Sequence, residues 1–141
     1  MPNPDPDILK AVIKWPKFAD EDFNMASDAL TRGRSRPYRL IAYHAQQCAE
    51  KCLKGYLVYH GEDFPYTHNI RRLLKLSGKY TTWPQGLEDA EELTPYAITT
   101  RYPGEDEEVT EAEANRAIEI AQKVRDRVRT ELRLLGMELR E

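Results

Sequence analysis

The chain has 141 residues, of which 40% are hydrophobic and 32% charged, and its formal net charge is −3. This length fits one domain and this composition excludes a disordered chain, while the negative charge argues against general affinity for nucleic acids. No apolar run approaches the roughly 20 residues that span a bilayer, and the acidic, Pro-rich start is unlike a signal peptide, so a cytoplasmic location without membrane contact is expected.

The N-terminal segment, residues 1–14, is predicted to be extended, because its first prolines alternate with other residues and favour extended backbone. Its apolar residues are expected to lie against the rest of the protein. The first helix is then predicted over residues 16–31, with a proline in its first turn. The buried side of this helix is traced by Phe18, Phe23 or Asp22, Ala26 and Leu30.

A long helix is predicted between Arg36 and Gly61, and the other elements are expected to pack around it. Apolar residues recur along it at intervals of three and four, namely Ile41, Ala45, Cys48, Cys52, Tyr56 and Tyr59. Gly55 interrupts this helix at a cost of about 1 kcal/mol relative to alanine, so we expect another helix to approach closely there. The two cysteines are expected to be reduced thiols in the core, since no further metal-binding pattern accompanies them.

The other side of this helix is polar. It carries Gln46, Gln47, Glu50 and Lys54. For the polar band of Gln47, Glu50, Lys51 and Lys54 the simplest interpretation is a solvated face supported by the Glu50–Lys54 ion pair at i, i+4. A nucleotide-contacting surface and a dimer interface are the alternatives. Leu53 and Leu57 also lie off the apolar stripe, and leucines exposed there would need a second copy of the chain as their partner.

Two shorter helices are predicted next. The first extends from its N-cap at Thr67 to Tyr80 and buries Ile70, Leu73 and Leu74. The second covers residues 84–98 with Leu87, Ala90, Leu93 and Ala97 inward. Its interior Pro95 predicts a kink or an early end near Glu92.

The last helix is predicted over residues 110–136, where Thr110 and Glu113 form a capping box and Gly136 ends the helix. Its buried positions recur at intervals of three and four: Ala117, Ala121, Val124, Val128, Leu132 and Leu135. No strand pattern occurs. The whole chain, residues 1–141, is therefore predicted to be a single all-α domain, an up-and-down bundle of four or five helices with antiparallel neighbours.

Three short strings then occur in a recognisable order: YHAQQCAEKCLKG at residues 43–55, YTHNI at residues 66–70 and RYP at residues 101–103. Together they resemble the HEPN family of small helical-bundle proteins. The family's pattern of a His, a Gln pair, Glu-Lys and a second Lys corresponds to His44, Gln46, Gln47, Glu50, Lys51 and Lys54. Its Thr-His and its Arg-Tyr-Pro correspond to residues 67–68 and 101–103, so the resemblance covers nearly the whole chain.

The resemblance implies a helical bundle, which agrees with the periodicity. It also implies a homodimer that works with a separate nucleotidyltransferase in a toxin–antitoxin-like pair. Some branches of the family are metal-independent ribonucleases that carry an Arg and a His separated by four to six residues. Others have been proposed to bind nucleotides, and many have no known activity. No cofactor and no metal are expected.

Arg39 and His44 have the spacing of the ribonuclease motif. The His would act as general acid or base and the Arg would stabilise the charge on phosphorus. Residues five apart on a straight helix point about 140° apart, however, so one face does not present both. The alternative interpretation of His44 is a hydrogen-bonded histidine at the edge of the core.

Further side chains are candidates for binding a nucleotide or an RNA phosphate: Gln47, Lys51, Lys54, His68, Arg101 and Tyr102. His68 and Arg101 could line one cleft, or each could serve a structural hydrogen bond. Near the C-terminus, Arg125, Arg129 and Arg133 form a stripe that is either a solvated face or an RNA-binding edge.

These observations leave three functions open. The leading hypothesis is a module that binds a nucleotide or an RNA phosphate. The second is a metal-independent endoribonuclease that uses His44 with Arg39, or His44 or His68 with Arg101, across a dimer cleft. The third is a structural interaction module without a ligand.

Overall fold

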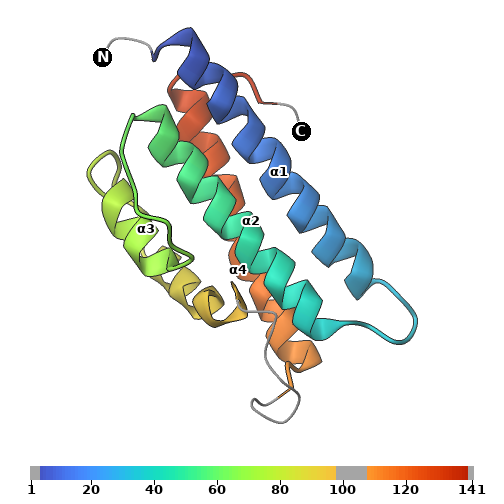
Figure 1. Cartoon of the computed structure of the whole chain (residues 1–141). Helices are drawn as coiled ribbons and strands as arrows, with labels where there is room; N and C mark the ends of the chain where they lie inside the picture. Colours follow the sequence, from blue (N-terminus) through green and yellow to red (C-terminus); the bar gives the residue numbers. More distant parts are fainter. Residues whose placement is uncertain (1–3, 98–107, 140–141) are drawn as a thin grey trace.

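The computed structural model describes residues 4–97 and 108–139, and this part of the chain forms helices without any β-strand. Along the chain the helices are α1 (Pro6–Leu30), α2 (Tyr38–Tyr59), α3 (Ile70–Ser77), the 3-10 helix η1 (Leu87–Ala97) and α4 (Glu111–Leu134). The predicted all-α bundle is confirmed (Figure 1). None of these described helices is both long and apolar enough to cross a bilayer.

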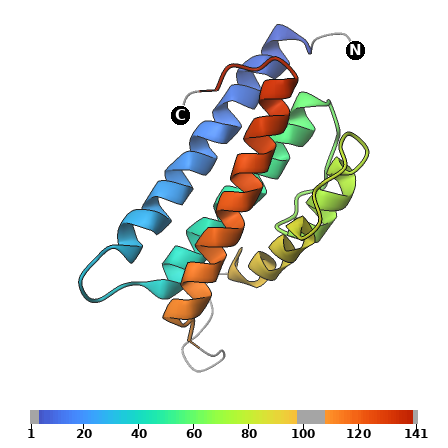
Figure 2. The ribbon, with the colours of Figure 1, turned by 180° about the vertical axis from the view of Figure 1, so that it is seen from behind.

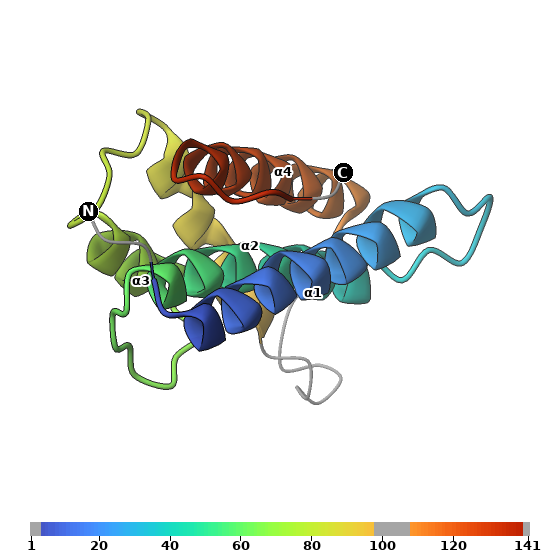
Figure 3. The ribbon, with the colours of Figure 1, turned by 90° about the horizontal axis from the view of Figure 1, so that it is seen from above.

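Helix α2 lies in the middle of the bundle and packs against every other described helix. Figure 3 shows α1 and α4 beside it, and Figure 2 shows α3 and η1 together on the remaining side. One small cluster joins Ala26, Ile41 and Ala114 at the start of α2, and the Tyr59 hydroxyl donates to the Leu135 carbonyl at its end. Helix α1 is therefore antiparallel to α2, as predicted, whereas α4 runs in the same direction as α2 because the chain first returns along α2 in residues 61–69.

The apolar side of α2 is the main core, as its spacing predicted. Residues Ile41, Ala45, Cys48, Cys52 and Tyr56 are all at most 4% exposed. This stripe meets the apolar side of α4, where the predicted positions from Ala117 to Leu132 are buried as well. The common core explains why these two helices are the best predicted elements.

Gly55 marks the closest approach of two helices, which confirms the reason inferred for a glycine in mid-helix. A Cβ built at this position would lie 2.6 Å from the Cβ of Trp15 on α1. Any side chain at residue 55 would therefore push α1 away from α2, because a Cβ cannot move independently of its own backbone.

The predicted extended N-terminal segment is wrong from residue 6 onward. Helix α1 begins there because the Asp5 side chain caps it, accepting from the Asp7 amide at 2.7 Å, and Pro6 suits a first turn. The helix continues through Pro16, and both Val12 and Pro16 are buried. Burial of this stripe against α2 outweighs the loss of one backbone hydrogen bond. Phe18, expected inside, is 44% exposed instead.

Both short helices differ from their predicted bounds. Helix α3 begins at Ile70, because the side chain that accepts from the Arg72 amide at 3.1 Å belongs to Asn69 and not to Thr67. The second short helix is a 3-10 helix that passes Glu92 and continues across Pro95. Its buried residues, Leu87, Ala90 and Leu93, are spaced by three, which matches three residues per turn.

Helix α4 agrees with its prediction in detail. The capping box is present, since the Thr110 side chain accepts from the Glu113 amide and the Glu113 side chain accepts from the Thr110 amide, both at 3.1 Å. At the other end Gly136 has a positive φ of 96°, which favours glycine. Both ends of α4 could thus be predicted from the residues at those ends.

Candidate functional site

The polar side of α2 is buried, which corrects the expected solvated face. Gln46, Gln47, Glu50 and Lys54 are each at most 9% exposed. Their burial follows from residues 60–69, which run back along α2 after its end (Figure 1). The spacing of apolar residues in the sequence does not reveal that residues 60–69 cover α2, because an irregular segment has no such period.

A continuous hydrogen-bond network satisfies these buried groups. Glu50 is its centre: the carboxylate lies 2.7 Å from His68 Nδ1 and accepts from Lys54 Nζ and Gln46 Nε2, both at 3.1 Å. Gln46 also donates to the His68 carbonyl at 3.2 Å, and Gln47 donates to the Gln46 side chain at 2.7 Å. The network therefore ties the returning segment to α2.

This arrangement changes the role of three predicted binding residues. Lys54 Nζ is enclosed by two aromatic rings, those of Phe64 and Tyr66, each 5.8 Å away. Gln47 is occupied within the network, and only His68, whose side chain is 41% exposed, could reach a ligand. The interpretation of His68 as a structural hydrogen-bonding residue is the one that these contacts favour.

Leu53 and Leu57 were expected to be exposed, and this expectation is wrong. Both are fully buried in the main core with Ile70 and Leu73 of α3. These two leucines therefore need no second copy of the chain as their partner. Helix α2 is enclosed on most of its apolar and most of its polar surface by elements of its own chain, although Leu40 in its first turn is 40% exposed.

His44 and Lys51 remain accessible, and Asp22 of α1 connects them. Asp22 Oδ1 lies 2.7 Å from His44 Nδ1, and Asp22 Oδ2 accepts from Lys51 Nζ at 2.5 Å. His44 and Lys51 are seven residues apart, two turns on the same side of α2. Their side chains are 27% and 28% exposed, whereas Asp22 is only 11% exposed. One buried carboxylate thus holds two half-exposed basic groups at the surface.

The sequence singled out His44 and Lys51 but missed their partner. Asp22 was considered only as an alternative to Phe23 on the buried side of the first helix. Asp22 is in fact buried, and a buried acidic residue requires a basic partner. This requirement could have indicated from the sequence that Asp22 has a basic partner, although it does not identify the residue.

Arg39 does not share the surface of His44. It is exposed in the first turn of α2, about 140° around the helix from His44. The expected geometric obstacle to an Arg39–His44 pair therefore applies. Arg101 and Tyr102, the remaining predicted site residues, lie outside the described residues.

The basic stripe near the C-terminus is mostly internal. Asp20 of α1 accepts from Arg125 Nε at 2.7 Å and from Arg129 Nη1 at 3.2 Å, and Arg129 is 5% exposed. Arg133 alone of the stripe is exposed. These contacts correct the expectation of a solvated face and remove most of the possible RNA-binding edge.

Cys48 and Cys52 are both free and buried. Their mutual hydrogen bond, together with burial, raises the pKa of the Cys48 thiol well above its ordinary value. Such a thiol is protonated and unreactive at neutral pH, as expected for core packing. Within the described residues no group of three or more His, Cys, Asp or Glu side chains is placed to hold a metal ion.

A family profile described as the HEPN domain matches residues 12–131. Two solved structures are similar: TT1696 from Thermus thermophilus, at 29% identity and a TM-score of 0.73, and ST0689, an archaeal HEPN homologue, at 29% identity and a TM-score of 0.68. The matches cover 84% and 85% of this chain respectively, and 96% of each of the two structures. Among curated proteins none matches this chain.

Proposed function

We propose that this chain, which belongs to the HEPN family, binds a phosphate group of a nucleotide or an RNA through His44 and Lys51. In this proposal the protein acts as a homodimer and works with a separate nucleotidyltransferase in a toxin–antitoxin-like pair. The family membership supports the partner, and the surface around Asp22 supports the ligand.

Phosphate binding is inferred from two basic groups, the His44 imidazole and the Lys51 ammonium, that share the Asp22 carboxylate. Asp22 uses both of its oxygens, so it fixes the direction of the imidazole and of the ammonium group together. His44 Nδ1 is engaged, and His44 Nε2 makes no hydrogen bond within the described chain, which leaves it to donate to a phosphate oxygen. Charge-assisted hydrogen bonds from positioned donors are the strong ones in phosphate recognition.

Binding is tested by fluorescence anisotropy with a labelled single-stranded RNA of mixed sequence and by thermal shift with a panel of nucleotides. A ligand at 100 times its dissociation constant adds about 2.7 kcal/mol to the free energy of unfolding. Lys51→Gln and His44→Ala should each weaken binding, whereas Lys10→Gln, which removes an exposed lysine of α1, should not. Equal binding by all of these variants contradicts the proposal.

The second candidate is a metal-independent endoribonuclease, and the orientation of His44 favours it. A carboxylate that is hydrogen-bonded to one imidazole nitrogen orients the ring so that the other nitrogen can act as a general acid or base. Lys51 shares the surface of His44, so Lys51 rather than Arg39 would stabilise the charge on phosphorus. Cleavage of RNA in EDTA that is lost in His44→Ala supports this candidate. Absence of cleavage at every protein concentration excludes it.

The homodimer draws support from exposed apolar residues beside this site. Phe18 and Met25, seven residues apart on α1, are 44% and 60% exposed and lie on the side of α1 that carries Asp22. Light scattering should give about twice the chain mass of 16.4 kDa. The double variant Phe18→Ser/Met25→Ser should be a monomer, whereas Leu134→Ser, which changes an apolar residue that is 76% exposed elsewhere, should remain a dimer.

The partner is tested by co-expression with a nucleotidyltransferase encoded beside this gene. Co-elution on size exclusion, and a change in the toxicity of either protein when both are expressed, support the pair. If RNA binding, cleavage and co-elution all fail, the third hypothesis, a structural module without a ligand, is the correct one.

A further inference from the structure

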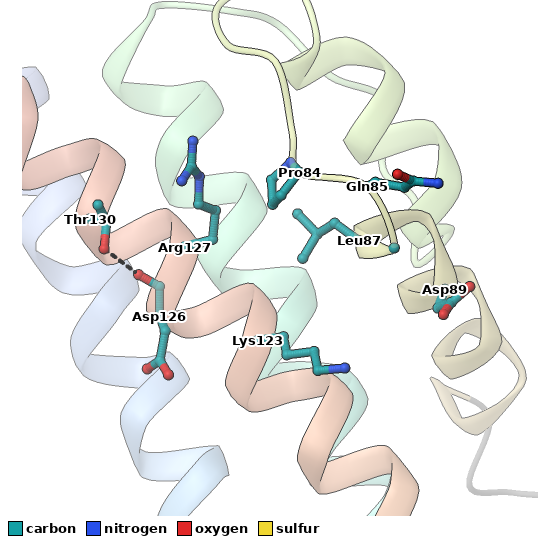
Figure 4. Close-up of a pocket in the computed structure, with 9 residues that line it drawn as sticks. Pro84, Gln85, Leu87, Asp89, Lys123, Asp126, Arg127 and Thr130 are labelled. Carbon is teal, nitrogen blue, oxygen red and sulfur yellow. Dashed lines mark hydrogen bonds between the residues drawn. The ribbon is translucent and has the colours of Figure 1, made fainter.

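A cavity lies between α4 and the segment that enters η1 (Figure 4). Its volume is about 470 Å³. The side facing η1 is lined by residues 84–87 and Asp89, and the side facing α4 by Lys123, Asp126, Arg127 and Thr130. None of these residues takes part in the site proposed above.

The cavity exists because the chain arches away from α4 before η1. The ring of Trp83 packs 5.4 Å from that of Tyr56, and Leu87 returns to the core with 6% exposure. Between them Gly86 has a φ of 98°, a conformation that turns the backbone sharply. A Cβ added at Gly86 would meet nothing within 4 Å, so this part of the backbone borders open space.

The wall formed by α4 carries two cations with unused donors. Lys123 makes no hydrogen bond or ion pair within the described chain. Arg127 Nη2 pairs with Glu131 at 2.8 Å, but Arg127 Nε is buried without a partner. Residues 123 and 127 are one turn apart and therefore share one side of α4.

The carboxylates of the lining do not offset these cations. Figure 4 shows the Asp126 side chain directed to the other side of α4, where its carboxylate accepts from Arg125 at 3.4 Å. Figure 4 also shows the Asp89 carboxylate directed away from α4, whereas Lys123 extends toward η1. The space between the two walls is therefore faced by cations, with Pro84 and Leu87 as apolar surface.

We propose that this cavity binds a small organic oxyanion, a carboxylate or phosphate group carried on a flat apolar ring. Lys123 Nζ pairs with the anion, the Arg127 guanidinium lines the same wall, and the ring packs on Pro84 and Leu87. The combination of an apolar wall with a few polar groups, at this volume, is that of a small-molecule site. The proposal is independent of nucleotide or RNA binding at His44.

The test uses amide chemical shifts of the ¹⁵N-labelled full chain titrated with benzoate and with phenyl phosphate. Saturable shifts at Gly86 and Leu87 with at least one probe support the site, and the tighter probe identifies the source as carboxylate or phosphate ester. Lys123→Gln should weaken binding by about tenfold or more, because it removes a charge-assisted contact. Lys123→Arg and Lys10→Gln should retain binding.

Three results would overturn the proposal. The first is the absence of saturable shifts at these amides with either probe. The second is unchanged affinity in Lys123→Gln. Because the Lys123 side chain is exposed, this substitution should leave the fold intact, so a loss of affinity would not reflect unfolding. The third is equally tight binding of benzylamine, a cation with the same ring, at the same amides.

Discussion

Glu50 allows a quantitative test of the buried network on α2. Its carboxylate is 4% exposed and contacts Lys54, which is itself only 7% exposed, as well as His68. In Glu50→Ala the ammonium group of Lys54 would remain inside the protein without its counter-charge. Removing one partner of a buried ion pair costs about 3–5 kcal/mol, so we expect a loss of about 4 kcal/mol in the free energy of unfolding. This is a large fraction of the roughly 5–15 kcal/mol that is typical of a domain.

Urea unfolding followed by circular dichroism measures this loss. The matched control is Glu92→Ala, which removes an exposed carboxylate that pairs with Arg116 at 2.6 Å and should cost about 1 kcal/mol or less. The double variant Glu50→Ala/Lys54→Met should recover part of the loss, because no buried charge remains. If Glu50→Ala and Glu92→Ala are equally destabilising, the polar side of α2 is solvated and the network has no role in stability.

Two further predictions follow from single residues. Gly55→Ala should lower the free energy of unfolding by about 1–3 kcal/mol, because the new methyl group overlaps Trp15 on α1. Gly33→Ala adds a methyl group in open space and should leave the stability unchanged. Equal urea midpoints for the two variants would contradict this prediction. Burial lowers the pKa of His60 from its ordinary value of 6.5, so the unfolded chain takes up a proton first and stability should fall as the pH falls below 6.5. His60→Phe should reduce this dependence in urea unfolding at about pH 5.5 and about pH 7.5, and an unchanged dependence would exclude His60 as its source.

The capped and periodic elements could be predicted from the sequence because their signals are local. The Thr110–Glu113 capping box and the spacing of apolar residues on α4 depend only on residues within one or two turns. The apolar stripe of α2 and the glycine at its centre, Gly55, were likewise visible in a short stretch of sequence. The family resemblance also rested on such short strings, and the profile match over residues 12–131 confirms it.

The candidate site was only half predictable. His44 and Lys51 were singled out, but Asp22, which positions them, lies 22 and 29 residues earlier in the chain. A helical period says which side of a helix is apolar and does not say which distant segment covers the polar side. For this reason Lys54 and Gln47 were assigned to ligand binding when they in fact belong to an internal network.

The amino-acid sequence by itself determined that this protein is an all-α domain of the HEPN family, because helix periods, caps and short motifs are properties of neighbouring residues. The tertiary structure decided which polar groups are available to a ligand. Residues 60–69 cover one side of α2, and Asp22 of α1 holds His44 and Lys51 on the neighbouring side. Burial depends on what packs against a surface, and that is settled only when segments far apart in the chain come together.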